Sequence, residues 1–97
     1  MQVIARSTLR DFYAVHPKAK APLESWYHEV DRADWPSPTE LRRRYSTASF
    51  LEGNRVVFKI GGNKYGLVVK VNYKFKSVFI LFIGTHKEYD RIKVEEL

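Results

Sequence analysis

Alternating apolar and polar positions identify strands in the C-terminal half of the chain. In residues 55–60 the even positions are apolar and alternate with Arg55 and Lys59, whereas in residues 64–73 the odd positions are apolar. A period of two is the pattern of a strand with one buried face. Residues 78–83 are apolar throughout. That predicts a central strand of the sheet, covered on both faces.

The tripeptide Gly-Gly-Asn at residues 61–63 predicts a tight hairpin, because these residues accept positive φ. Two registers keep the apolar faces of the two strands aligned. A turn on the two glycines would set Lys59 directly opposite Lys64, which is unfavourable between like charges. A turn one residue later pairs Lys59 with Gly66 instead. We therefore predict the second register.

The N-terminal half has helical rather than alternating patterns. Residues 2–5 are a short candidate strand, and Ser7 or Thr8 is a candidate N-cap for a helix that ends at Pro17. A second helix should begin near Pro22, a residue that suits the first helical turn. Its apolar stripe follows i, i+3, i+4, i+7 spacing and consists of Leu23, Trp26, Tyr27 and Val30.

The segment before the strands contains a run of three arginines. We predict a short third helix over residues 39–45 and a loop over residues 46–54. Three consecutive arginines, here centred on Arg43, cannot share one helical face, so a solvated surface is the default and phosphate contact is the alternative. Together the elements predict an α+β fold. A mostly antiparallel sheet, made of an N-terminal strand and a three-stranded C-terminal meander, would carry two to three helices on one face.

Length and composition predict a single domain over residues 1–97, with 44% hydrophobic residues available for its core. The chain has no cysteine, which excludes disulfides and thiolate chemistry and is typical of a cytoplasmic protein. We expect no secretory signal, because the N-terminus lacks a continuous apolar stretch. The longest apolar run, residues 78–83, is far too short to span a membrane.

Charge distribution points to an anionic partner. The net charge is +6, and between Glu52 and Glu88 there are seven Lys or Arg residues and no acidic residue. The face of the sheet opposite the helices should therefore be basic, with the bare backbone of Gly66 at its centre. Nucleic acid and an acidic protein segment are both suitable partners.

The sequence THKEYD at residues 85–90 directly follows a predicted strand, where side chains can project over the sheet. RNA cleavage without a metal needs a base, an acid and cations that stabilise charge on the phosphate. His86 exchanges protons near neutral pH, Tyr89 is able to stack on a base or act as a weak acid, and neighbouring lysines supply charge. The alternative is that His86 and Asp90 merely cap or pair within the last turn. We expect no zinc site and no cofactor, since the three histidines lie on different elements without a cysteine.

Two motifs carry a family resemblance: GGNKY at residues 61–65 and GTHKEYD at residues 84–90. Their joint occurrence at this separation, after a strand, two helices and a WxxP turn, resembles the HigB-type toxins of bacterial toxin–antitoxin pairs. These toxins belong to the wider RelE-like group of mRNA interferases. Further matching segments are Leu23, Trp26-Tyr27, Ala33-Asp34-Trp35, Tyr45, residues 54–58 and residues 67–69.

The resemblance implies a RelE-like fold and ribosome-dependent, metal-independent cleavage of translated mRNA by attack of the 2′-hydroxyl. It also implies a HigA-type helix-turn-helix antitoxin as partner in a hetero-oligomer. Carried onto this chain, it implies catalytic roles for His86, Tyr89, Asp90 and Lys64. The RNA-binding residues would be Lys59, Lys70, Lys74, Lys76, Lys87 and Arg43.

Two departures from the family pattern bear on activity. Gly66 and Leu81 stand where the family commonly has Arg. Neither can replace a guanidinium, which binds phosphate bidentately, so we expect weakened cleavage. Two alternatives remain open: a non-catalytic RNA- or ribosome-binding module, and an antitoxin-binding protein without nuclease activity.

Overall fold

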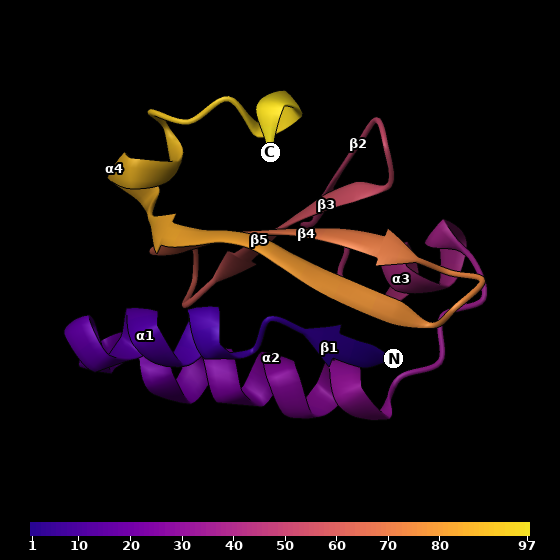
Figure 1. The fold of residues 1–97 in the computed structure, drawn as a ribbon, viewed down its shortest axis with the longest axis horizontal. Helices are drawn as coiled ribbons and strands as arrows, with labels where there is room; N and C mark the ends of the chain where they lie inside the picture. The colour runs from indigo at the N-terminus through magenta and orange to yellow at the C-terminus, as the bar shows by residue number, and fades with distance from the viewer.

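The computed structural model describes residues 1–97 and contains one five-stranded sheet with helices on both sides (Figure 1). Its strands are β1 (Gln2–Ile4), β2 (Ser49–Leu51), β3 (Arg55–Ile60), β4 (Tyr65–Asn72) and β5 (Ser77–Thr85). The spatial order is β1-β5-β4-β3-β2. β1 runs parallel to β5, and the other three neighbouring pairs are antiparallel. The α+β prediction is confirmed, but the sheet is mixed and has one more strand than expected.

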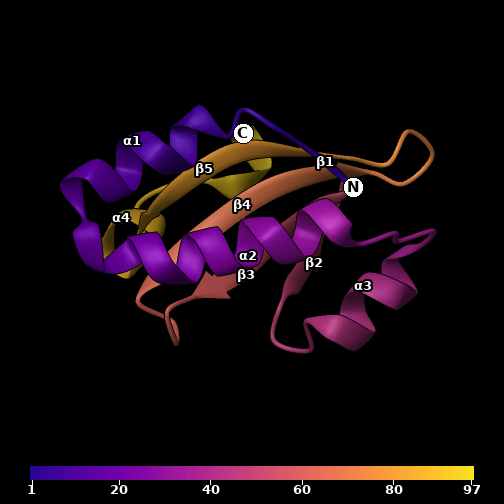
Figure 2. The same ribbon diagram turned by 90° about the horizontal axis from the view of Figure 1, so that it is seen from below.

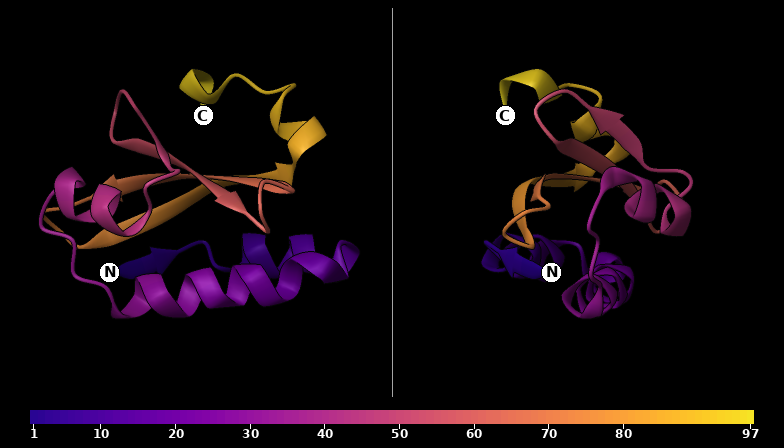
Figure 3. Two further views of the ribbon diagram at one scale, coloured as in Figure 1. Left: turned by 180° about the vertical axis from the view of Figure 1, so that it is seen from behind. Right: turned by 90° about the vertical axis from the view of Figure 1, so that its right-hand side faces the viewer.

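Two long helices cover one face of the sheet. Residues 90–97, called the C-terminal segment below, lie on the other face. The helices are α1 (Ser7–Val15), α2 (Lys20–Arg32), α3 (Pro38–Arg44) and α4 (His86–Tyr89), with short 3₁₀ turns at Pro17–Ala19 and Val94–Glu96. Figure 2 shows α1 and α2 side by side below the sheet. α3 and α4 lie toward opposite ends of the long axis, and both views of Figure 3 place the C-terminal segment above the sheet.

The main core lies between the sheet and the two long helices. The predicted stripe on α2 is confirmed, since Leu23, Trp26 and Val30 are buried. The Trp26 ring meets Phe58 of β3 edge-on, with ring centroids 5.4 Å apart. Tyr27 is half-buried at the edge of the stripe, where the guanidinium of Arg6 lies 3.8 Å from its ring centroid.

The hairpin between β3 and β4 has the predicted register. Lys59 pairs with Gly66, and Ile60 pairs with Tyr65. The turn residues at 61–63 all have positive φ, with values of 64°, 66° and 85°. The two glycines and the asparagine therefore meet the backbone requirement that predicted the turn.

The second face of the sheet differs from the prediction at its centre. Val57 and Val68 are buried there against Val94 of the C-terminal segment. Half-buried apolar residues surround this second cluster: Leu81, Phe82, Tyr89 and Ile92. The face is therefore basic only toward its ends. The sequence does indicate an apolar centre on this face, because Val-Val-Phe in β3 and Leu-Val-Val in β4 each place an apolar residue on both faces of the sheet.

A β-bulge interrupts β5 at Leu81. Val68 pairs with Phe82 and Val69 pairs with Ile80, so Leu81 has no partner on β4. An extra residue of this kind locally increases the twist of its strand. It lets Leu81 and Phe82 both contribute to the second cluster, while Ile80 remains in the main core.

Two local predictions are wrong. Arg6 occupies the N-cap position of α1, and no side chain caps that helix, so neither Ser7 nor Thr8 has the expected role. The predicted loop at residues 46–54 contains β2, which adds a short edge strand beside β3. β2 has only three residues, too few for a period-two pattern to stand out. None of the helices combines the length and the apolar character needed to cross a membrane.

We predict that Leu23→Ala lowers the free energy of unfolding by about 2–5 kcal/mol, because it opens a cavity beneath a fully buried side chain. Urea denaturation measures this difference. Val15→Ala is the matched control, since Val15 is 75% exposed at the end of α1, and it should change stability by no more than about 0.5 kcal/mol. Equal losses in the two variants would contradict the assigned core.

Candidate active site

A cleft of about 210 Å³ lies where the start of α4 meets the β3–β4 hairpin. Three of the residues predicted for the site line it: Lys59, His86 and Tyr89. The remaining lining residues are Ser49, Val57, Phe58, Asn63, Tyr65 and Gly66. None of the nine is acidic, so an ammonium group and an imidazole meet here without a carboxylate in the lining. Such a cleft favours an anionic ligand.

Two glycines let α4 approach the sheet closely. Gly66 of β4 and Gly84 of β5 face each other in the ladder. A Cβ on Gly66 would lie 2.9 Å from Cγ and Cδ1 of Tyr89. A Cβ on Gly84 would lie 2.5 Å from Cζ of Phe82 and 3.1 Å from Cβ of Glu88, so Gly84 makes room for both the Phe82 ring and α4. Gly66 is consequently buried under the tyrosine ring. The prediction of bare, exposed backbone at this position is wrong, because Tyr89 occupies the space that a side chain would fill.

A capping box fixes the start of α4. The Glu88 N–H donates to Oγ1 of Thr85 at 3.2 Å, and the Thr85 N–H donates to Oε1 of Glu88 at 2.8 Å. This backbone hydrogen bond from Thr85 holds the pKa of the Glu88 carboxyl below its usual value. The His86 N–H donates to the carbonyl of Lys64 at 2.9 Å. The helix start is thereby attached to the hairpin turn.

His86 and Asp90 lie one helical turn apart and contact each other. Nε2 of His86 is 3.3 Å from Oδ2 of Asp90, and both side chains are more than half exposed. A carboxylate at this position orients the ring. When Nε2 carries the hydrogen that faces Asp90, Nδ1 is the nitrogen free to accept a proton. Pairing of His86 with Asp90 was considered above as an alternative to catalysis. With this geometry, the pairing and a catalytic role of His86 are compatible.

Two aromatic residues form the walls of the cleft. Tyr89 is half-buried, packs beside the second cluster and covers Gly66 with its ring. Tyr65, which the sequence did not single out, lines the cleft at the start of β4 and meets Phe12 of α1 edge-on at 5.6 Å. Its position in the GGNKY motif could have identified Tyr65 as a site residue. The alternating strand pattern already explained it as a core residue, so it was not singled out.

The lysines nearest the cleft come from three elements. Lys59 lies in the lining, on β3 opposite Gly66. Lys64 is exposed in the hairpin turn, and its carbonyl rather than its ammonium group is bonded to α4. Lys87 is exposed on α4 next to His86. Lys64 and Lys87 therefore border the cleft without lining it.

The remaining cations of the predicted RNA-binding set lie elsewhere. Lys70 and Lys74 line a second hollow, farther along β4. Lys76 forms an ion pair with Asp34 at 2.5 Å, and the hydrogen bond from Lys76 lowers the pKa of the Asp34 carboxyl. Because the second cluster lies between the cleft and the hollow, the expected continuous basic face is divided into separate regions.

Each of the three consecutive arginines on α3 has a partner within the chain. Arg42 lies over the ring of Phe50 at 4.4 Å, and Arg43 pairs with Glu40 at 3.1 Å. Arg44 pairs with Glu29 of α2. α3 lies far along the long axis from α4 (Figure 1), so Arg43 is not brought to the cleft. This arrangement favours the default interpretation of the arginine run as an exposed, locally paired surface.

Leu81 also lies outside the cleft. It is half-buried at the bulge and packs beside Val57 and Val68. Of the two positions where the family commonly has Arg, Gly66 lines the cleft and Leu81 does not. An arginine at position 81 would have to leave the apolar cluster, and an arginine at position 66 would have to displace Tyr89.

Comparison with known proteins relates most of the chain to one family. Residues 19–92 match the model of the HigB_toxin family, described as the RelE-like toxic component of a toxin–antitoxin system. The chain is 26% identical over 94 residues to the mRNA interferase HigB of Escherichia coli O6:H1, covering 95% of this chain and 91% of that protein. It is 25% identical over 92 residues to the mRNA interferase toxin HigB of Escherichia coli K12, covering 93% and 88% respectively. The mRNA interferase HigB of Shigella flexneri has the same identity and coverage.

Gly66→Ala should destabilise the fold by about 1–3 kcal/mol, because the new methyl group meets the base of the Tyr89 side chain rather than its flexible end. Tyr89→Ala removes Cγ and Cδ1. The double variant should therefore lose less free energy of unfolding than the sum of the losses in the two single variants, by at least about 0.5 kcal/mol. Urea denaturation of the four proteins gives this coupling. Strict additivity would mean that Tyr89 does not rest on Gly66.

The capping box should be pH-dependent. The folded-state pKa of Glu88 lies below its ordinary value of 4.5, so its charge stabilises the turn above that value and is lost as the pH falls through the folded pKa. Glu88→Gln keeps an acceptor oxygen but loses the charge. Protection of the Thr85 amide from hydrogen exchange should therefore be lower in the variant above about pH 5 and equal in both proteins in acid. Glu95→Gln, in an exposed side chain without an ion pair, should leave that protection unchanged at every pH.

Proposed function

Because the chain belongs to the HigB family of RelE-like toxins of toxin–antitoxin systems, we propose that it is an endoribonuclease that cleaves translated mRNA on the ribosome. The observation that carries this proposal is the cleft in which Lys59, His86 and Tyr89 meet without a carboxylate in the lining. Cleavage of translated message requires the cytoplasm, where we propose that the protein acts. All three relatives named above have mRNA interferase in their names and match nearly the whole chain.

The proposed reaction is transfer of the phosphoryl group within the RNA strand. The 2′-oxygen of one nucleotide attacks the adjacent phosphorus, and the bond from phosphorus to the 5′-oxygen of the next nucleotide breaks. The 2′-hydroxyl loses its proton to a base, and the departing 5′-oxygen gains a proton from an acid. The products are a 2′,3′-cyclic phosphate and a free 5′-hydroxyl. Residues of the cleft supply the base, the acid and the cation that this reaction needs.

His86 is the proposed base. Its contact with Asp90 orients the ring, leaves Nδ1 free to accept the 2′-hydroxyl proton and stabilises the imidazolium that forms. Lys59 is placed to stabilise the negative charge that develops on the phosphoryl oxygens. The Tyr89 hydroxyl is the proposed proton donor to the 5′-oxygen. Lys64 and Lys87, at the rim, would hold the flanking phosphates.

Membership of the family implies an antitoxin partner. We propose an antitoxin of the HigA type with a helix-turn-helix DNA-binding domain, which would form a hetero-oligomer with this chain. The acid-free cleft suits an acidic antitoxin segment as well as RNA, since both are anionic. A gene for a small helix-turn-helix protein beside the gene for this chain would support the partner.

A second candidate function is binding of RNA or the ribosome without cleavage. It is favoured by the charge of the cleft, where Lys59 is the only lysine or arginine in the lining and Gly66 stands in place of the guanidinium of the family pattern. A single ammonium group binds phosphate as a point charge and lacks the bidentate geometry of arginine. Under this candidate, RNA would bind in a salt-dependent manner and remain intact.

Induction of the chain in a bacterial host without an antitoxin tests the proposal. We expect growth arrest and new mRNA ends, and His86→Ala should lower cleavage by about 10²- to 10⁴-fold. Lys59→Ala should lower it by about 10²- to 10³-fold. Arg43→Ala is the control, because Arg43 pairs with Glu40 away from the cleft, and it should leave cleavage unchanged. Absence of both arrest and new ends, with salt-dependent RNA binding retained, would replace the first candidate by the second.

A further inference from the structure

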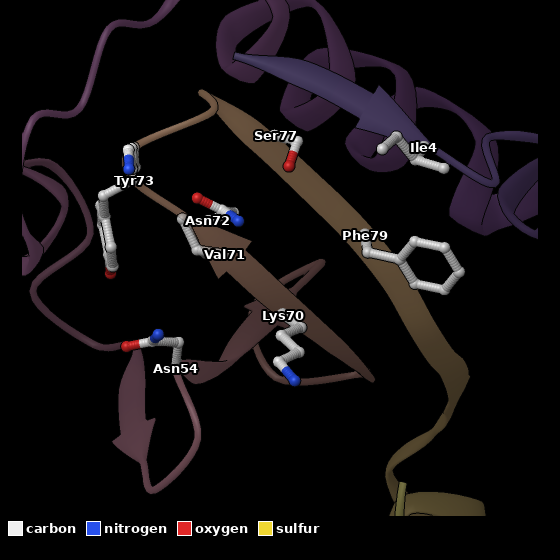
Figure 4. A pocket seen from close by; sticks show the side chains of 9 residues that line it. Ile4, Asn54, Lys70, Val71, Asn72, Tyr73, Ser77 and Phe79 are labelled. Atoms are coloured by element: carbon white, nitrogen blue, oxygen red, sulfur yellow. The ribbon is translucent and has the colours of Figure 1, made fainter.

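A second hollow, of about 470 Å³, opens on the same face of the sheet as the cleft. Its lining combines Lys70, Asn72 and Lys74 from β4 and the following turn with Ser77 and Phe79 from β5 (Figure 4). The other lining residues are Ile4, Asn54, Val71 and Tyr73. The volume lies within the range of roughly 300–1,000 Å³ that small-ligand sites occupy. No carboxylate lines the hollow.

The aromatic ring of Phe79 is unusually exposed to solvent for a residue on an inner strand of the sheet. β5 has a neighbouring strand on each side, yet Phe79 is 46% exposed. Cross-strand pairing sets it beside Ile4 on β1 and Lys70 on β4. The C-terminal segment covers the neighbouring part of this face, at Val68, but not Phe79. An uncovered aromatic ring beside a lysine is therefore a fixed feature of the sheet surface.

The lysines of this hollow have no acidic partner. Lys70 and Lys74 form no ion pair, whereas Lys76 in the same turn pairs with Asp34. Lys70 also stands directly opposite Arg55 in the ladder. The guanidinium of Arg55 already donates to the carbonyl oxygens of Leu97 and Glu52, so the Lys70 ammonium is the charge of this pair that is left without a partner. The charge of the hollow is thus available to a ligand.

We propose that this hollow is a separate binding site for single-stranded RNA, in which one base stacks on Phe79 and adjacent phosphates pair with Lys70 and Lys74. Aromatic residues on a sheet surface stack bases in this way, and a basic groove follows the backbone. The Asn54 amide supplies a donor and an acceptor for the edge of a base, and Asn72 supplies its NH₂ donors, because its Oδ1 already accepts the Phe75 N–H at 3.0 Å. The identity of the ligand as RNA rests on the proposed function, whereas the site itself rests on the geometry.

The site is distinct from the cleft. Gly66 and Lys70 are four residues apart on β4, which corresponds to roughly 13 Å along a strand. Between them lies Val68, which Val94 covers. An RNA strand that occupies both places would cross the C-terminal segment, where Lys93 pairs with Glu96. Message held in the cleft would thereby gain a second point of attachment beyond the cleavage position.

The lining favours RNA over an acidic protein segment. A helix or strand of a partner protein would need a continuous apolar strip, whereas here the exposed apolar surface is limited to Phe79 and its neighbour Ile4. Side-chain amides, a serine hydroxyl and two ammonium groups make up much of the rest. This mixture of one stacking surface, hydrogen-bonding groups and cations is typical of nucleotide sites.

Fluorescence of Phe79→Trp provides a direct test. The native Trp26 and Trp35 are buried, so the new indole should account for any change in emission. A short oligouridine strand should quench it as a base stacks. In the unlabelled protein, with binding followed by a dye on the strand, Phe79→Ala should weaken affinity by roughly 5- to 100-fold, and Phe79→Tyr should restore it. Lys70→Ala should weaken binding and lower the salt slope by about one.

Matched controls distinguish the site from general attraction. Val15→Ala removes an apolar side chain that is 75% exposed on α1, outside the lining, and Lys18→Ala removes an exposed charge from another surface. Both should leave the affinity unchanged. Thermal unfolding should confirm that every variant is folded. A strand of the same length without bases should bind weakly and should not quench the indole.

The RNA site at the hollow and the proposed cleavage activity can be confirmed or rejected independently. Phe79-dependent binding that persists in His86→Ala supports the site, whether or not the native protein cleaves RNA. Cleavage without quenching would overturn this inference and leave the proposed function intact. Equal affinity for the strand without bases, or for polyglutamate, would also overturn it, since the hollow would then attract any polyanion.

Discussion

The contact between α4 and the backbone of the sheet is the constraint on which the candidate site depends. Gly66 and Gly84 face each other on β4 and β5. The absence of a side chain at Gly66 lets Tyr89 lie directly over the strand, and the space at Gly84 is taken by the Phe82 ring and by Glu88. His86 is therefore held beside the β3–β4 hairpin, with its N–H on the Lys64 carbonyl. Any larger residue at the facing positions would raise α4 from the sheet and separate the imidazole from Lys59.

The C-terminal segment gives the basic face of the sheet its organisation. By covering Val57 and Val68 it produces a small apolar centre, with a cleft on one side and a hollow on the other. The two regions have similar charge but different chemistry. The cleft contains an imidazole and two phenol groups, whereas the hollow has an open aromatic ring and side-chain amides. The net charge of +6 alone would not distinguish these two surfaces.

Local rules predicted much of the fold and part of the site. The charge of Lys59 and the conformation of the Gly-Gly-Asn turn were sufficient for the hairpin register, because both act between near neighbours in the sequence. The bulge at Leu81 and the burial of Gly66 were not predictable in this way, since Leu81 packs in the second cluster with Val94 and Gly66 is covered by Tyr89, contacts between residues distant in the sequence. The sequence brought His86, Tyr89 and Lys59 into one hypothesis, and the structure places all three in one cleft. It could not separate Lys70 from that group, because alternation identifies a face of a sheet but not a position along it.

The shortness of α4 has a dynamic consequence. A helix of four residues cannot form alone in water, since it has too few internal hydrogen bonds to offset the entropy of ordering its backbone. It depends on the capping box and on its contact with the sheet, whereas the main core lies on the other face, under α1 and α2. The turn that carries His86 is thus a local unit able to open while the rest of the chain stays folded. If the proposed function holds, the fraction of molecules competent for cleavage is an equilibrium of this one turn, which a bound partner can shift without altering the fold.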